Sequence, residues 1–302
     1  MAAPATEDAL PPSTLALHNL ACLDCRFRHS SSRPIAVGDE VGINCVETLN
    51  DTFVPRNQPA VLRGALNDWI PIQKWSDDLY LRDAAPDSSV SVRRADANNG
   101  CVSGSGTQYQ STEMAWPALV DAHIDAASRG VAAERYPAQL RLRTALPRLF
   151  ADCQPVPPLC GALGPIFRNA PSAYFGCGHA TPLHFDLLEN ILCVVRGRKL
   201  VTLWHPADSH LLYPMEEASE AAFSRANVYE PDLTRFPLLE EAQKRALHVE
   251  LNAGDALYLP VCWWHAIRTP IGERSISVTY HCEQPEGKRR EPEEEWQDEE
   301  DG

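Results

Sequence analysis

The feature that most constrains the fold is a series of short apolar segments, separated by glycines, that begins near residue 172. Each segment has the length of a strand, and Gly178, Gly197, Gly254 and Gly272 lie between them. Many short strands with regular turn signals are typical of a β-barrel or a two-sheet jelly roll. The sequence therefore predicts a mainly β fold, with strands at residues 172–176, 181–188, 191–195, 199–204, 247–251, 256–259, 266–268 and 275–281.

The part of the chain before this series predicts helical additions to the β core. An apolar run at 59–64 is expected to form a buried strand. Ser76 or Asp77 can cap a short helix that follows it. A strand and a polar loop are expected over 88–110. Apolar positions at helical spacing, closed by a glycine, predict a helix over 112–129.

Composition divides the chain into an extension, a main domain and a tail. Residues 1–44 are expected to form an N-terminal extension, and residues 45–283 the main domain. Within that domain the β core is expected at 171–283, interrupted by a proline-containing insertion at 205–246 that covers one end of the barrel. Residues 284–302 hold nine acidic and three basic side chains, which predicts a disordered acidic tail.

Charge and cysteine content narrow the classes of function. The net charge of −14 disfavours a nonspecific nucleic-acid binder, because such a protein needs a basic face. Ten cysteines are too few for a disulfide scaffold, and no export signal is expected, so reduced thiols in the cytoplasm or nucleus are predicted. No apolar run is long enough for a membrane span. Cys22 and Cys25 form a CxxC pair, but a structural zinc site needs four ligands and no second pair exists.

Two side chains suited to a metal ion alternate along the predicted strand 181–188. Because residues i and i+2 of a strand point to the same face, His184 and Asp186 should project together while Phe185 points away. One imidazole and one carboxylate are half of a metal site. A single pair of this kind is common by chance, so it needs further ligands to carry weight.

The third ligand is expected from His265, which follows a proline-containing turn after the strand 256–259. Alone, a histidine after two tryptophans is more typical of a packed core residue. Two imidazoles and one carboxylate, however, make a facial triad that leaves adjacent positions open, as in non-haem Fe(II) oxygenases. Since one carboxylate offsets only part of the charge of a divalent ion, an anionic chelating co-substrate is favoured.

Lys199 begins a strand that is otherwise apolar. A buried ammonium is costly unless its charge is paired, so a ligand carboxylate is a candidate partner if no acidic side chain lies beside it. The alternative is that the side chain extends to solvent. Thr181 can add a hydroxyl near His184, and His179 and His281 flank the proposed site.

Taken together, these segments closely resemble the JmjC (cupin-like) branch of the Fe(II)/2-oxoglutarate oxygenases. The family pattern T-P-x-H-x-D, followed by E-N and G-x-K, is matched by Thr181, Pro182, His184, Asp186, Glu189, Asn190, Gly197 and Lys199. The second pattern, G-D-x-L-x-x-P-x-x-W-W-H, is matched by Gly254, Asp255, Leu257, Pro260, Trp263, Trp264 and His265. The resemblance covers residues 45–283.

The resemblance implies a double-stranded β-helix with a defined set of site residues. It implies that Fe(2+) is held by His184, Asp186 and His265. The distal carboxylate of 2-oxoglutarate would be bound by Lys199 and Thr181, and Asn190 would line the same pocket.

The resemblance also implies a reaction. A dioxygenase of this branch uses O2 and 2-oxoglutarate, releases succinate and CO2, and here would hydroxylate a protein side chain. Tyr136 and Gln139 are candidates for a further co-substrate contact. The sequence departs from the family near Thr279, where many members have an asparagine.

Three alternatives stay open at this point. The first is an N-methyl-lysine demethylase acting on histone peptides, and the second is a hydroxylase of a tRNA base, for which the 196–199 stretch could contact phosphate. The third is a catalytically silent cupin that serves as a binding module. A protein or peptide partner is favoured over tRNA, no membrane partner is expected, and the oligomeric state, including a homodimer, is left open.

Overall fold

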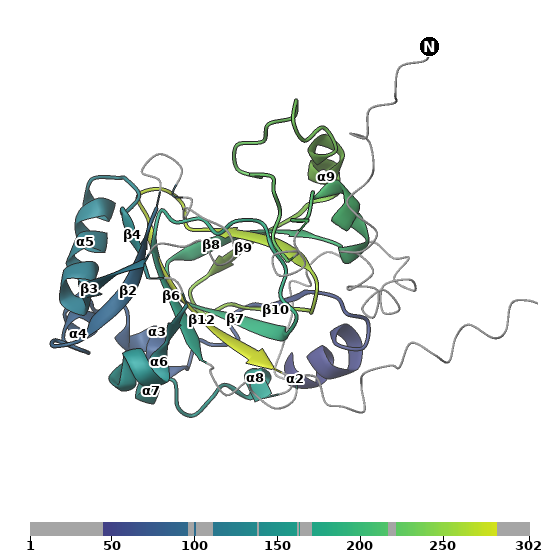
Figure 1. Ribbon diagram of the computed structural model, residues 1–302. Coiled ribbons are helices and arrows are strands. Elements are labelled where there is room, and N and C mark those ends of the chain that lie inside the picture. Colours follow the sequence, from purple (N-terminus) through teal and green to yellow (C-terminus); the bar gives the residue numbers. More distant parts are fainter. Residues whose placement is uncertain are drawn as a thin grey trace, which may run out of the picture.

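The computed structural model describes residues 45–95, 100, 111–137, 139–161, 163, 171–216 and 222–282 (Figure 1). The predicted N-terminal extension with Cys22 and Cys25, and the predicted acidic tail, lie outside the described residues. Six cysteines are free, buried thiols: Cys153, Cys160, Cys177, Cys193, Cys262 and Cys282. Among the described helices, none is long and apolar enough to cross a membrane.

Helices and strands alternate in the first half of the chain, and strands dominate the second half. In chain order the elements are α2 (Cys45–Thr48), η2 (Leu49–Phe53), β1 (Ala60–Leu62), α3 (Ile70–Lys74), α4 (Asp78–Arg82), β2 (Ser89–Arg94), β3 (Ser111–Ala115), α5 (Trp116–Ser128), β4 (Arg135–Tyr136), β5 (Leu140–Arg141), α6 (Leu142–Ala145), α7 (Pro147–Asp152), α8 (Pro158–Gly161), β6 (Ser172–Cys177), β7 (Glu189–Arg196), β8 (Arg198–Trp204), η3 (Pro206–Leu211), α9 (Leu239–Arg245), β9 (Leu247–Asn252), β10 (Ala256–Leu259), β11 (Trp264–Arg268) and β12 (Arg274–Cys282).

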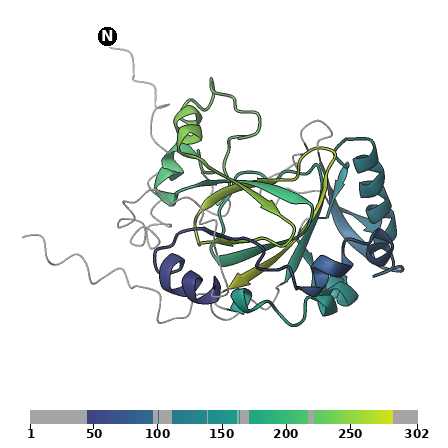
Figure 2. The same cartoon turned by 180° about the vertical axis from the view of Figure 1, so that it is seen from behind.

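Two antiparallel sheets form the core of the domain. The larger has the strand order β1-β10-β7-β12-β6-β5, and the smaller has the order β11-β8-β9. The small sheet lies above the large one in Figure 1, and Figure 2 shows the same two layers from behind. Apolar side chains of both sheets, such as Leu192 and Leu203, pack in one cluster between them. This arrangement confirms the predicted jelly-roll, or double-stranded β-helix, core.

Helices cover the outer face of the large sheet. Trp116 of α5 meets Phe175 of β6 edge to face, with ring centroids 4.9 Å apart. The buried carboxylate of Asp152, at the end of α7, accepts hydrogen bonds from Trp75 Nε1 at 3.0 Å and from the Tyr80 hydroxyl at 2.5 Å. This carboxylate therefore joins α7 to the region of α3 and α4. Asp77 caps α4 by accepting from the Leu79 amide, as the sequence predicted.

A third sheet, of order β3-β2-β4, packs beside α5. The predicted helix over 112–129 is wrong in its first turn, because residues Ser111–Ala115 form β3 and pair with β2. The helix begins only at Trp116, and Pro117 occupies its first turn, where a missing N–H costs nothing. The apolar periodicity located the helix, but long-range strand pairing decided where it starts.

The predicted strand over 181–188 is also wrong. In this segment only His184 forms bridges, on one side to Phe223 and on the other to His265. Phe185 N then donates to Ala222 O at 2.9 Å, and Cys262 N donates to Asp186 O at 2.8 Å. Because successive residues pair with different segments, no continuous ladder forms.

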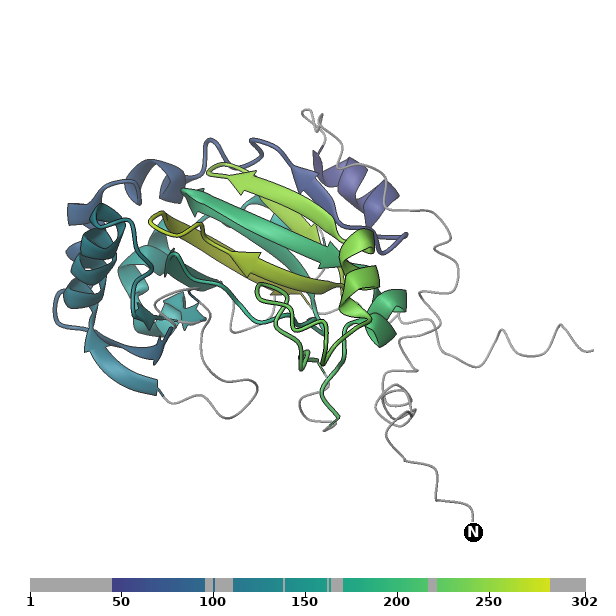
Figure 3. The ribbon, with the colours of Figure 1, turned by 90° about the horizontal axis from the view of Figure 1, so that it is seen from above.

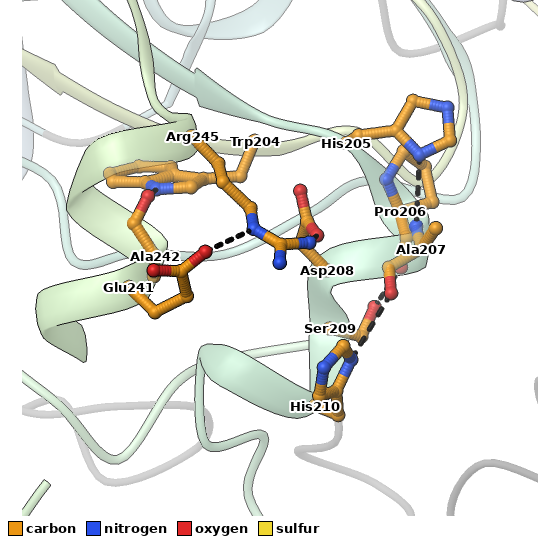
Figure 4. Close-up of polar contacts among 10 residues, drawn as sticks. All are labelled: Trp204, His205, Pro206, Ala207, Asp208, Ser209, His210, Glu241, Ala242 and Arg245. Carbon is orange, nitrogen blue, oxygen red and sulfur yellow. Dashed lines mark hydrogen bonds and ion pairs between the residues drawn. The ribbon is translucent and has the colours of Figure 1, made fainter. Parts of the chain in front are cut away.

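The insertion between β8 and β9 packs as two short helical pieces at one end of the strands (Figure 3). Trp204 Nε1 donates to Ala242 O at 2.9 Å, which attaches α9 to the end of β8. Arg245 of α9 donates to Asp208 of η3 at 2.8 Å and to Glu241 at 3.0 Å, as Figure 4 shows. These contacts fix η3 and α9 to one another and to the small sheet.

Candidate metal centre and co-substrate pocket

His184, Asp186 and His265 come together in the structure. One ligand atom from each lies within 4.8 Å of the others. His265 is held by β11, whereas His184 is held by hydrogen bonds on both sides of an irregular segment. The two imidazole centroids are 4.1 Å apart. The structure therefore places two nitrogen donors and one carboxylate around a common point.

The other ring nitrogen of each histidine faces a carbonyl oxygen. His184 Nδ1 lies 2.8 Å from Pro182 O, and His265 Nδ1 lies 3.0 Å from Trp263 O. A carbonyl can only accept, so each Nδ1 carries the proton and Nε2 is the ring nitrogen left to face a metal ion. Burial lowers the pKa of His265 to about 4, which keeps this imidazole neutral. Both rings are therefore oriented as metal-binding histidines usually are.

Asp186 supplies the only carboxylate of the group. Its Oδ2 lies 3.8 Å from His265 Nε2 and 3.6 Å from His281 Nε2. Burial raises the pKa of the Asp186 carboxyl, but His281 and the two other imidazoles outweigh it and hold the pKa well below its usual range. The group is therefore an anion at neutral pH, as a metal ligand must be.

A cavity of about 330 Å³ opens beside these ligands. Polar side chains form much of its wall, and Ile267, Leu192 and Phe223 add apolar surface. The other lining residues are Arg93, Tyr136, Gln139, Tyr174, His179, Thr181, Pro182, His184, Asp186, Asn190, Lys199, His265, Ser277, Thr279 and His281.

Lys199 reaches this cavity from β8 and is only 4% exposed, so the alternative of a side chain extended to solvent is wrong. Its Nζ donates to Thr269 Oγ1 at 3.3 Å, and no carboxylate among the described residues pairs with it. Burial lowers the pKa of this amine to about 8. The ammonium is a buried donor group that lacks an anionic partner within the described fold.

Asn190 and Thr181 also line the cavity, but they differ in whether their polar atoms have partners. Among the described residues, none hydrogen-bonds the buried Oδ1 of Asn190. The Thr181 hydroxyl lies 3.3 Å from Ile267 O and accepts from Ile267 N at 3.1 Å. Thr181 therefore also ties the segment that carries His184 and Asp186 to β11, a structural role that the sequence did not suggest.

The sequence model of the family described as "Cupin-like domain" matches residues 46–287. The chain belongs to the cupin-like JmjC family. It is 28% identical over 243 residues to lysine-specific demethylase 8 of Xenopus tropicalis, which covers 78% of this chain and 50% of that protein. It is 28% identical over 258 residues to the human bifunctional peptidase and (3S)-lysyl hydroxylase JMJD7, with 76% of this chain and 79% of that protein covered.

A shorter match, 37% identical over 84 residues, relates 28% of the chain to 25% of the mouse tRNA wybutosine-synthesizing protein 5. The chain spans about half the length of the first curated relatives it matches. The aligned part is 50% of the Xenopus tropicalis protein and 54% of Jumonji C domain-containing protein 5 of Drosophila melanogaster. The substrates in these names belong to those proteins.

Several motif residues of this cupin-like domain hold the frame of the site. Glu189 accepts from the Tyr258 hydroxyl at 2.9 Å and from Val261 N at 3.2 Å, which fixes the turn before His265. Asp255 pairs with Arg63 at 2.7 Å. The motif residues Trp263 and Trp264 are core residues with 1% exposure and are not among the cavity residues.

Arg93, Phe223 and Ser277 also line the cavity of this JmjC domain, and sequence reasoning missed all three. They come from β2, the insertion and β12, and no motif marks them. The Phe223 ring stacks on the His184 imidazole, with centroids 5.5 Å apart and an angle of 14°. Tyr136 and Gln139, the candidates for a further co-substrate contact, do lie on the cavity wall, as does Thr279.

Proposed function

We propose that the protein is an Fe(II)- and 2-oxoglutarate-dependent oxygenase that hydroxylates a protein side chain. One observation carries this proposal: a facial set of His184, Asp186 and His265 shares a cavity with the buried Lys199 ammonium. Two imidazoles and one carboxylate suit Fe(II), and no described cysteine is among the residues that line the cavity. An ammonium in the same cavity suits the distal carboxylate of a dicarboxylic co-substrate.

The metal and the co-substrate supply the redox chemistry when bound: one oxygen atom of O2 enters the substrate C–H bond, and the other enters succinate as CO2 is released. The chain's own residues would hold and orient the metal ion and the co-substrate. His184, Asp186 and His265 hold the ion, while Lys199 fixes the far end of the co-substrate. Asn190 and Thr181, which line the same cavity, would contact the rest of that molecule.

The choice of a hydroxylase acting on protein rests on two observations. Among the described lining residues Asp186 is the only carboxylate, so a methylammonium group would find no second anion in the cavity. One relative that aligns over most of its length is named a (3S)-lysyl hydroxylase. A protein or peptide is therefore the proposed partner, in the cytoplasm or nucleus.

The test is turnover by the purified full chain supplied with Fe(II), 2-oxoglutarate and O2. We expect succinate to form without added substrate at a slow, iron-dependent rate, and Asp186→Ala to abolish it. A peptide library then separates the reactions by mass, because hydroxylation adds one oxygen whereas demethylation removes a methylene. A tRNA arm tests the base-hydroxylase alternative. If the wild-type chain neither binds nor consumes 2-oxoglutarate, the proposal is wrong.

A further inference from the structure

The wall behind Lys199 is built from two hydroxyls and a glycine that belong to none of the motifs. Thr269 follows β11 and Ser275 lies in β12, and each is 1% exposed. Thr269 Oγ1 accepts from Lys199 Nζ at 3.3 Å, and the two hydroxyl oxygens lie 2.5 Å apart. Lys199 lines the cavity, whereas Thr269 and Ser275 do not. The two hydroxyls therefore lie behind the end of the lysine side chain, away from the cavity.

Gly176 of β6 pairs with Ser275 and closes this arrangement. A Cβ at this glycine would lie 2.9 Å from Thr269 Oγ1 and 3.6 Å from both Lys199 Nζ and Ser275 Oγ. The backbone of Gly176 is not in the left-handed region, so conformation does not require glycine there. The lack of space requires glycine, because any side chain at this position would push against the Thr269 hydroxyl that contacts the ammonium.

The contacts of Lys199 leave donors for a ligand. An ammonium has three N–H donors, and one of them points to Thr269. The main chain of Thr269 is itself fixed, since its N donates to His179 O at 2.8 Å. An ammonium tethered to a fixed hydroxyl has a defined position, which matters when it must meet a carboxylate at the end of a small molecule.

We propose that Thr269 and Ser275 are positioning residues that hold the Lys199 ammonium for the distal carboxylate of the co-substrate, and that Gly176 leaves the room they need. This inference rests on the proposed function. Thr269 gives the ammonium its acceptor, and Ser275 orients the Thr269 hydroxyl. Neither residue touches the co-substrate.

The experiment measures binding to the full chain loaded with Mn(II), without turnover. Two probes are compared: 2-oxoglutarate, and 2-oxobutanoate, which keeps the chelating keto acid but lacks the distal carboxylate. Thr269→Val should weaken 2-oxoglutarate about tenfold, since it removes one hydrogen bond to a charged group. It should leave 2-oxobutanoate and Mn(II) affinity unchanged, and Thr269→Ser should restore 2-oxoglutarate binding to within about threefold.

Ser275→Ala and Gly176→Ala should reproduce the pattern of Thr269→Val and keep the test decisive if that variant does not fold. The matched control is Thr202→Val, on β8 but with its hydroxyl toward His248 at 3.2 Å, which should bind both probes as wild type does. Equal weakening of both probes, or no weakening, overturns the positioning role alone. Failure of the wild-type chain to bind 2-oxoglutarate overturns the proposed function and this inference with it.

Discussion

His184 and His265 exchange a pair of main-chain hydrogen bonds, from His184 N to His265 O at 3.1 Å and from His265 N to His184 O at 2.7 Å. The two proposed ligands come from segments far apart in the chain, yet the backbone itself sets their separation. Asp186 joins the same frame because its carbonyl accepts from Cys262 N at 2.8 Å. The ligand set is therefore arranged by the fold, and side-chain changes within it should leave the frame intact.

The first prediction concerns the metal. Loss of a residue that only supports a metal ligand weakens metal binding by about 10–100-fold. His184→Ala and His265→Ala should each weaken Mn(II) or Fe(II) binding by more than this. Asp186→Ala should also abolish iron-dependent succinate formation. Metal content after dialysis and titration by electron paramagnetic resonance measure the loss. His248→Ala, on the exposed side of β9, is the control and should bind as wild type. Stoichiometric metal in His184→Ala would contradict the assignment.

The second prediction separates the co-substrate from the metal. Lys199→Ala should raise the 2-oxoglutarate concentration needed for half-maximal succinate release by about 10–100-fold, because a charge-assisted hydrogen bond is lost. Metal affinity should change little, since Lys199 is not among the clustered ligands. Lys244→Ala, on exposed α9, serves as the control. Equal loss of metal and co-substrate would show that Lys199 acts on the fold.

The sequence predicted those parts of the site that depend on neighbouring residues better than those that depend on contacts between distant segments of the chain. The alternation of His184 and Asp186 correctly indicated a shared face, although the segment is not a strand. Both side chains line the cavity, while Phe185 packs against Trp264 at 4.8 Å. Residues of this segment alternate in direction as they would in a strand, although each one pairs with a different part of the chain. The periodicity therefore predicted which side chains share a face, but it did not predict the pairing partners.

The rest of the site depends on chain closure, which local patterns do not encode. Thr269, Ser275 and Gly176 meet only because β6, β12 and the end of β11 converge behind β8. Phe223 reaches His184 from an insertion whose path no periodicity describes. For Lys199, by contrast, the sequence alone predicted an anionic partner, because an ammonium in an apolar strand needs a compensating charge.

A third prediction tests the helical layer independently of the site. Asp152→Ala removes the shared acceptor of Trp75 Nε1 and the Tyr80 hydroxyl and leaves the buried Trp75 donor unpaired. The free energy of unfolding should fall by about 3 kcal/mol in urea titration. Asp121→Ala, which breaks the exposed pair with Arg82, should cost less than about 1 kcal/mol. Folded Asp152→Ala should keep wild-type metal affinity, and a loss there would link this layer to the ligands.

A fourth prediction concerns the insertion. Arg245→Ala removes the partner of Asp208, whose side chain is 12% exposed, and so loosens the contact between α9 and η3 (Figure 4). Amide hydrogen exchange should become faster in α9 and in residues 222–226, because these parts pack in one cluster. Lys244→Ala, one residue away with exposed partners, should not change it. Unchanged exchange in Arg245→Ala would mean that apolar packing alone holds the insertion.

The last prediction follows from the pKa of Lys199, which burial lowers from 10.5 to about 8. In the unfolded chain the amine stays protonated up to about its ordinary pKa, so between these two values the unfolded state binds more protons than the folded state. Stability without co-substrate should therefore rise with pH over this window, by about 1 kcal/mol per pH unit. Lys199→Met lacks the amine and should lose that slope while other titrating groups contribute equally to both chains. Parallel urea titrations of wild type and Lys199→Met from pH 7 to pH 10 measure the difference, and identical slopes would show that the amine is not destabilised by burial.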